Sequence, residues 1–68
     1  MFDRIKLVEA MRAQGMSPTE LAAAAELSRP SMWAILVGKS TPRNRTAKRL
    51  ADALGLDVLT LWTDEARP

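Results

Sequence analysis

Residues 17–39 read Ser-Pro-Thr-Glu-Leu-Ala-Ala-Ala-Ala-Glu-Leu-Ser-Arg-Pro-Ser-Met-Trp-Ala-Ile-Leu-Val-Gly-Lys, and this stretch predicts two short helices joined by a tight turn. The start of the first helix is well marked. Ser17 is placed to cap it, Pro18 suits its first position because proline has a fixed φ and no N–H, and Glu20 completes a Ser-x-x-Glu capping box.

A second helix is expected to start at Ser28 and to end at Gly38. Pro30 falls within its first turn, where the missing N–H does little harm. Three apolar residues follow at the i, i+3, i+4 spacing of a buried helical face: Met32, Ile35 and Leu36. Only about three residues, 26–28, separate the two helical patterns, so the helices must cross at a steep angle, as in a helix-turn-helix.

The flanking sequence predicts three more helices and therefore an all-α fold. One covers residues 3–14 and is followed by Gly15, and another runs from about Asn44, as its N-cap, to Gly55. Asp57 can cap a short fifth helix. That last helix is expected to hold Val58, Leu61 and Trp62.

The length of 68 residues fits a single domain, residues 1–68, whose helix-turn-helix occupies about 17–38. The tail, 64–68, has nothing to bury and is expected to fray. The chain lacks cysteine and histidine, a nucleophile-base pair and a glycine-rich phosphate loop. We therefore expect no metal, no cofactor, no small-molecule ligand and no enzymatic activity.

No apolar run reaches the roughly 20 residues of a membrane span, and the N-terminus lacks the apolar core of a signal peptide. We therefore expect a cytoplasmic protein that does not interact with a membrane.

The charge is distributed unevenly along the chain. Residues 27–51 contain six basic residues and no acidic one, whereas the rest holds four basic residues and all eight acidic ones. A run of like charge is often only a solvated surface. Here it coincides with the second helix of the helix-turn-helix and the segment after it, which favours a surface that faces phosphates.

Several short motifs together resemble the phage-repressor and Cro type of helix-turn-helix domain, the XRE-like family. They are Leu-Val-Glu-Ala-Met-Arg-Ala-Gln-Gly-Met-Ser at 7–17, Glu-Leu-Ala at 20–22, Leu-Ser-Arg at 27–29, Gly-Lys at 38–39, Pro42, and Leu-Ala-Asp-Ala-Leu-Gly-Leu at 50–56. The resemblance implies a compact five-helix domain similar to lambda repressor. It also implies a transcriptional regulator, bacterial or phage-encoded and associated with the nucleoid, that binds a roughly palindromic operator as a homodimer.

In that family the second helix of the motif lies in the DNA major groove. The resemblance places five residues toward the bases: Arg29, Pro30, Ser31, Trp33 and Ala34. Arg29 can bond to guanine O6 and N7, although a phosphate contact or a free surface charge is the alternative. Pro30 and Ala34 can offer only apolar contact, for instance with a thymine methyl group, where the family usually has polar residues.

Trp33 has three interpretations that the sequence leaves open. It can lie over its neighbours as a half-buried hydrophobe, contact DNA, or serve as a hot spot for a protein partner. The last interpretation gives the alternative function, a protein-binding module that keeps the fold. A phage regulator, a restriction controller and an antitoxin would all share this sequence pattern.

Phosphate contacts are expected from the N-terminus of the first motif helix and from the segment after the second. The candidates are Ser17, Thr19, Lys39, Ser40, Thr41, Arg43, Asn44 and Arg45. Lys48 and Arg49 are expected to be peripheral. Excess apolar residues suggest a dimer contact, although scattered exposed hydrophobes are also normal. The dimer candidates are Ile5, Val8, Leu59 and Trp62.

Two further departures from the family pattern have physical consequences. Met11 and Leu36 stand where relatives often have a buried Arg–Glu ion pair, and two apolar partners avoid the desolvation of both charges. We expect Met11 to touch Leu36 in the core. Glu26 stands where the tight turn often has Gly, and a non-glycine residue at positive φ costs on the order of 1 kcal/mol, so the turn is either strained or remodelled.

Overall fold

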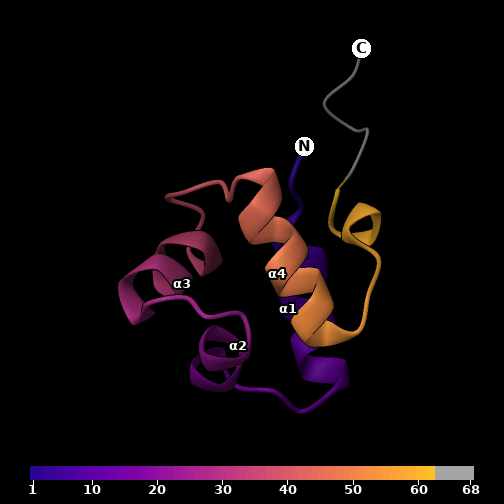
Figure 1. Ribbon diagram of the computed structural model, residues 1–68, viewed down its shortest axis with the longest axis horizontal. Helices are drawn as coiled ribbons and strands as arrows, with labels where there is room; N and C mark the ends of the chain where they lie inside the picture. Colours follow the sequence, from indigo (N-terminus) through magenta and orange to yellow (C-terminus); the bar gives the residue numbers. More distant parts are fainter. Residues whose placement is uncertain (63–68) are drawn as a thin grey trace.

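The computed structural model describes residues 1–62, which form four α-helices, one 3-10 helix and no sheet (Figure 1). The elements are α1 (Arg4–Ala13), α2 (Pro18–Ala24), α3 (Arg29–Leu36), α4 (Asn44–Leu54) and the 3-10 helix η1 (Val58–Leu61). The all-α prediction is confirmed for this part of the chain. The tail whose fraying was predicted, 64–68, lies outside the described residues.

The helix starts follow the caps expected from the sequence. In the capping box, the backbone N–H of Ser17 donates to Glu20 Oε1 at 2.9 Å, and the N–H of Glu20 donates to Ser17 Oγ at 3.1 Å. Ser28 caps α3 by accepting a hydrogen bond from the N–H of Ser31. Asp3 caps α1, so this helix is one residue shorter at each end than the predicted span of 3–14.

Two details differ from the prediction. Asn44 is the first residue of α4 and Arg43 is its N-cap, because the chain stays extended through Arg43 after the buried Pro42. The fifth element is a 3-10 helix that ends at Leu61, so Trp62 lies outside it. Trp62 instead has an extended backbone and forms an isolated antiparallel β-bridge with Phe2.

The core is made of apolar side chains from all five elements. Its largest fully buried members are Leu7, Leu21, Met32, Leu50 and Leu61. Helix α4 packs against α2 and η1, and α1 packs against α3 and η1. Among residues 1–62 no polar or charged side chain is buried, so this core is held by apolar packing alone.

Helix α1 is also bonded to the ends of α3 and α4. The Arg4 guanidinium donates to the main-chain carbonyl oxygen of Leu36, at 3.2 Å, and the Gln14 amide donates to that of Leu54. Leu36 and Leu54 are the last residues of their helices, where carbonyl groups lack helical partners. One side chain of α1 and one from its C-cap residue therefore satisfy the last turns of α3 and α4.

Candidate nucleic-acid interface

Helix α3 buries one side and exposes the other. Met32 and Ile35 are buried, and Leu36 is half-buried against the core that also contains Met11. Trp33 and Val37 face outward, with 56% and 53% of their surface exposed. The predicted inward and outward faces of α3 are therefore confirmed, while a direct contact between Met11 and Leu36 stays a prediction.

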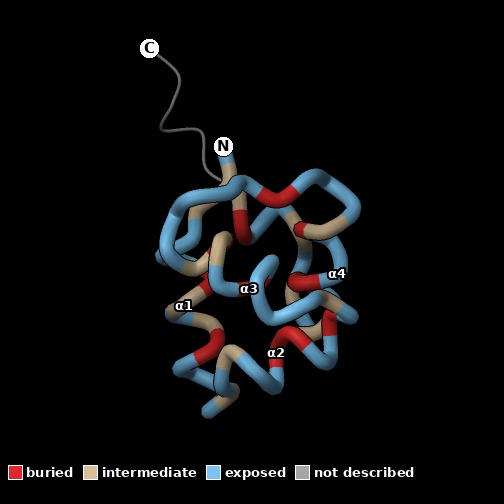
Figure 2. The backbone as a smooth tube through the Cα atoms, turned by 90° about the vertical axis from the view of Figure 1, so that its left-hand side faces the viewer, coloured by how far each residue is buried: buried red, intermediate tan, exposed pale blue. Residues whose placement is uncertain are grey.

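The residues expected to face bases lie on the exposed part of α3. Arg29, Pro30 and Ser31 are exposed in its first turn, and Ala34 is half-buried one turn later. Ser28 Oγ donates a hydrogen bond to Ser31 Oγ at 2.9 Å, so the Ser31 hydroxyl keeps its own hydrogen for another acceptor. Figure 2 looks onto α3 and shows that much of this helix is open to solvent.

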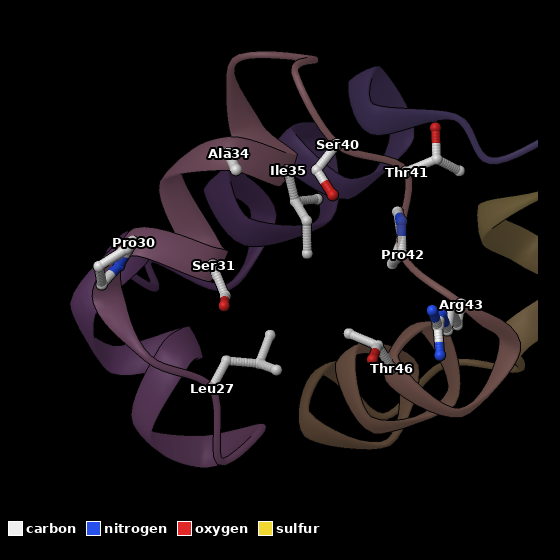
Figure 3. Close-up of a pocket in the computed structure, with 10 residues that line it drawn as sticks. All are labelled: Leu27, Pro30, Ser31, Ala34, Ile35, Ser40, Thr41, Pro42, Arg43 and Thr46. Carbon is white, nitrogen blue, oxygen red and sulfur yellow. The ribbon is translucent and has the colours of Figure 1, made fainter.

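An open groove of about 440 Å³ runs beside α3 (Figure 3). It separates α3 from the following loop and the first turn of α4. The lining residues are Leu27, Pro30, Ser31, Ala34, Ile35, Ser40, Thr41, Pro42, Arg43 and Thr46. The groove thus brings together predicted base-facing residues and predicted phosphate-contacting residues, which come from separate segments.

Sequence reasoning missed Thr46 as a member of this site. Thr46 lies one helical turn after Arg43, and both residues line the α4 side of the groove. That spacing is the signal that could have identified Thr46, once a helix starting at residue 44 was expected.

The loop between α3 and α4 is tied to α3. The backbone N–H groups of Lys39 and Ser40 both donate to the carbonyl oxygen of Ala34, at 2.9 and 3.1 Å, and Pro42 is buried. These contacts hold a loop whose polar and basic side chains are exposed. The exposed phosphate candidates here are Lys39, Ser40, Thr41, Arg43, Asn44 and Arg45.

Lys48 is engaged elsewhere on α4. Its Nζ lies 3.5 Å from Asp52 Oδ2 in an exposed i, i+4 ion pair. This pairing agrees with its expected peripheral place, because an acidic partner offsets its charge.

The N-terminus of α2 already holds a carboxylate. The capping box uses the Ser17 hydroxyl and places Glu20 there, while Thr19 is exposed beside it. The hydrogen bond from the Ser17 backbone N–H, followed by the Ser17 side chain, lowers the pKa of Glu20 below its ordinary value of 4.5. A negative charge therefore stands where a phosphate contact was predicted.

The turn between α2 and α3 keeps a left-handed residue at the position where the family often has Gly. Glu26 has φ of 58°, in the left-handed region that non-glycine residues seldom adopt. Its side chain is exposed, and the conformation lets the N–H groups of Glu26 and Leu27 donate to the carbonyl oxygens of Ala23 and Ala22, at 3.2 and 2.8 Å, which closes the end of α2.

The four dimer candidates lie on α1 and on or directly after η1. Ile5 and Leu59 are exposed, at 61% and 72%, whereas Val8 is half-buried. Trp62 is half-buried in an edge-to-face contact with Phe2, with ring centroids 5.7 Å apart. In Figure 1, η1 lies on the opposite side of the molecule from α3.

Within 1–62, no three side chains of the metal-ligating types cluster closely enough to hold an ion. No helix in this part of the chain has the length and hydrophobicity needed to cross a membrane.

Comparison with known proteins gives one match. A family model described as a helix-turn-helix domain matches residues 6–61, which is most of the chain. No curated protein and no solved structure matches. The matched region contains all of α2, α3 and α4 and the groove between α3 and α4.

Proposed function

The chain belongs to the helix-turn-helix domain family, and from that premise we propose that it regulates transcription by binding a specific operator in double-stranded DNA. Helix α3 enters the major groove, and its exposed first turn faces the base edges. Lys39, Arg43 and Arg45 contact the flanking phosphates.

One observation carries this proposal. The groove beside α3 places the exposed base-facing side of the helix next to a loop and helix start that are rich in hydroxyl and basic groups. The segment from residue 27 to 51 that forms it has six basic and no acidic residues. Such a surface is complementary to a duplex, which presents base edges between two rows of phosphates.

Selection from a random duplex library tests the proposal. The enriched duplex and a scrambled version of it are labelled, and binding is followed by fluorescence anisotropy. We expect preference for the enriched sequence and a loss of affinity of about three to five orders of magnitude between roughly 50 and 200 mM salt. Absence of binding to any duplex at low salt would overturn the proposed function.

We further propose that the chain binds DNA as a homodimer. A single module of this size buries only a modest area on DNA, so two-fold pairing strengthens binding. The enriched sequence is then expected to contain two inverted half-sites about 10 base pairs apart, or a multiple of that spacing. A single asymmetric half-site bound with one-to-one stoichiometry would contradict the dimer.

A protein partner is the second candidate function. It is favoured by the exposed apolar side chains of Trp33 and Val37, which a purely polar recognition helix would not show. Salt dependence separates the two functions, because an apolar protein interface loses little affinity over the range that abolishes DNA binding.

A further inference from the structure

The centre of the exposed side of α3 is apolar. Trp33 and Val37 continue the row that starts at Arg29, with spacing i, i+4 and i+8, and Pro30 and Ala34 form the neighbouring row. Apart from the indole N–H of Trp33, hydrogen-bonding side chains on this exposed side are found only in the first turn, at Arg29 and Ser31.

This arrangement limits what the helix can recognise. In the major groove, adenine, guanine and cytosine present only hydrogen-bond donors and acceptors. Thymine presents one acceptor, O4, and also an apolar C5-methyl group. An apolar side chain pressed against a donor or acceptor leaves that group without water or partner, which is unfavourable. Against a methyl group the same side chain removes apolar surface from water, which is favourable.

We propose that α3 recognises its operator mainly through thymine C5-methyl groups, which contact the apolar rows at Trp33 and Ala34. Arg29, at the start of the first row, is left for a flanking guanine. This inference rests on the proposed function, because it specifies which feature of the duplex the α3 surface reads.

The charge around the apolar rows favours DNA over a protein as their occupant. Lys39 follows the end of α3. Arg43 lies across the groove from α3. No acidic residue interrupts residues 27–51. An apolar patch bordered by this much positive charge is complementary to methyl groups lying between phosphates.

Replacing thymine with uracil isolates the methyl group. The duplex enriched from the random library is synthesised with deoxyuridine in place of each thymidine, which keeps base pairing and the O4 acceptor. We expect the affinity to fall about fourfold for each methyl group that the helix contacts. Equal affinity for the thymine and uracil duplexes would overturn the inference while leaving the proposed function in place.

Two variants assign the effect to α3. Trp33→Ala removes an exposed side chain, so the fold is retained, and it should lower affinity for the thymine duplex while reducing the ratio of thymine to uracil affinity. Lys39→Ala is the matched control, because losing a phosphate contact weakens both duplexes alike and leaves the ratio unchanged. A ratio unaffected by Trp33→Ala and by Ala34→Ser would contradict the assignment to α3.

The outcomes distinguish the two levels of the proposal. A protein that binds neither duplex at low salt overturns both the function and the inference, and directs attention to a protein partner for Trp33. A protein that binds both duplexes equally overturns only the role of the methyl groups.

Discussion

Arg4 occupies the space beside Gly38 at the end of α3. Its guanidinium donates to the Leu36 carbonyl oxygen at 3.2 Å, and its Nε would lie 3.1 Å from a Cβ atom at position 38. The missing side chain of Gly38 therefore makes room for the group that closes the last turn of α3. A cation at this helix end also interacts favourably with the helix dipole.

Replacement of Arg4 by alanine is expected to destabilise the fold modestly. The bond is exposed to solvent, so we expect the free energy of unfolding to fall by about 0.3–1 kcal/mol in urea denaturation. Lys6→Ala is the matched control, because Lys6 is an exposed cation on the same helix. Equal effects of the two substitutions would show that the bond to Leu36 contributes nothing.

Replacement of Gly38 by alanine should be more damaging than the same change at Gly15. Both residues have positive φ, 83° and 63°, so each substitution costs about 1–2 kcal/mol in backbone strain. A Cβ at Gly15 meets no atom within 4 Å, whereas at Gly38 it meets Arg4. The extra cost at Gly38 should disappear when Arg4 is also alanine, and a double-mutant cycle of unfolding free energies measures this coupling.

Replacement of Glu26 by glycine is expected to stabilise the protein. The substitution relieves the left-handed strain at φ of 58° and removes no buried contact, but glycine loses more entropy on folding. The net gain should be about 0.5–1 kcal/mol, seen as a higher urea midpoint with an unchanged slope. A loss of stability would mean that the Glu26 side chain has a favourable role in the turn.

The stability of the capping box is expected to depend on pH. The pKa of Glu20 is lowered in the folded state, so its charged form stabilises the fold above the ordinary value of 4.5, and this contribution is lost as the pH falls through the folded pKa. Glu20→Gln keeps a side-chain oxygen to accept from Ser17 at every pH. The stability advantage of the native chain over this variant should therefore be present at pH 7 and shrink below 4.5.

Denaturation of both chains between pH 7 and acid measures this difference. Glu9→Gln serves as the control, since Glu9 is an exposed carboxylate outside the caps of α1. An advantage over Glu20→Gln that stays constant with pH would contradict the role of the charge.

Two basic residues of α4 should differ in their effect on DNA binding. Arg45 is exposed in the first turn beside the groove, whereas Lys48 is paired with Asp52. Arg45→Ala should lower affinity for all duplexes and reduce the slope of log affinity against log salt by about one. Lys48→Ala should leave this slope unchanged. Equal slopes for the two variants would show that Arg45, at the start of α4, does not contact a phosphate.

Features that depend on neighbouring residues were predictable from the sequence. Ser17, Glu20 and Ser28 signal helix starts because their caps bond within three residues along the chain. The spacing of Met32 and Ile35 likewise gave the buried side of α3. The family resemblance identifies the place of Glu26 in the turn, but not whether its backbone keeps a positive φ.

Features that join distant segments could not be predicted in this way. The bonds from Arg4 to Leu36 and from Gln14 to Leu54 depend on how α1 lies against two other helices. The placement of Ser31 and Thr46 along the same groove has the same origin. The start of α4 was placed one residue too late, because the contacts that bury Pro42 decide where the chain leaves its extended conformation.

The pairing of Phe2 with Trp62 bears on the order in which the chain folds. The backbone bridge, the ring contact and the bond from the Asp3 N–H to the Leu61 carbonyl oxygen join the two ends of the described chain. Bringing such distant residues together carries the largest loop-closure entropy in the fold. We therefore expect this closure to form after the rate-limiting step, so that Phe2→Ala speeds unfolding and leaves the folding rate nearly unchanged.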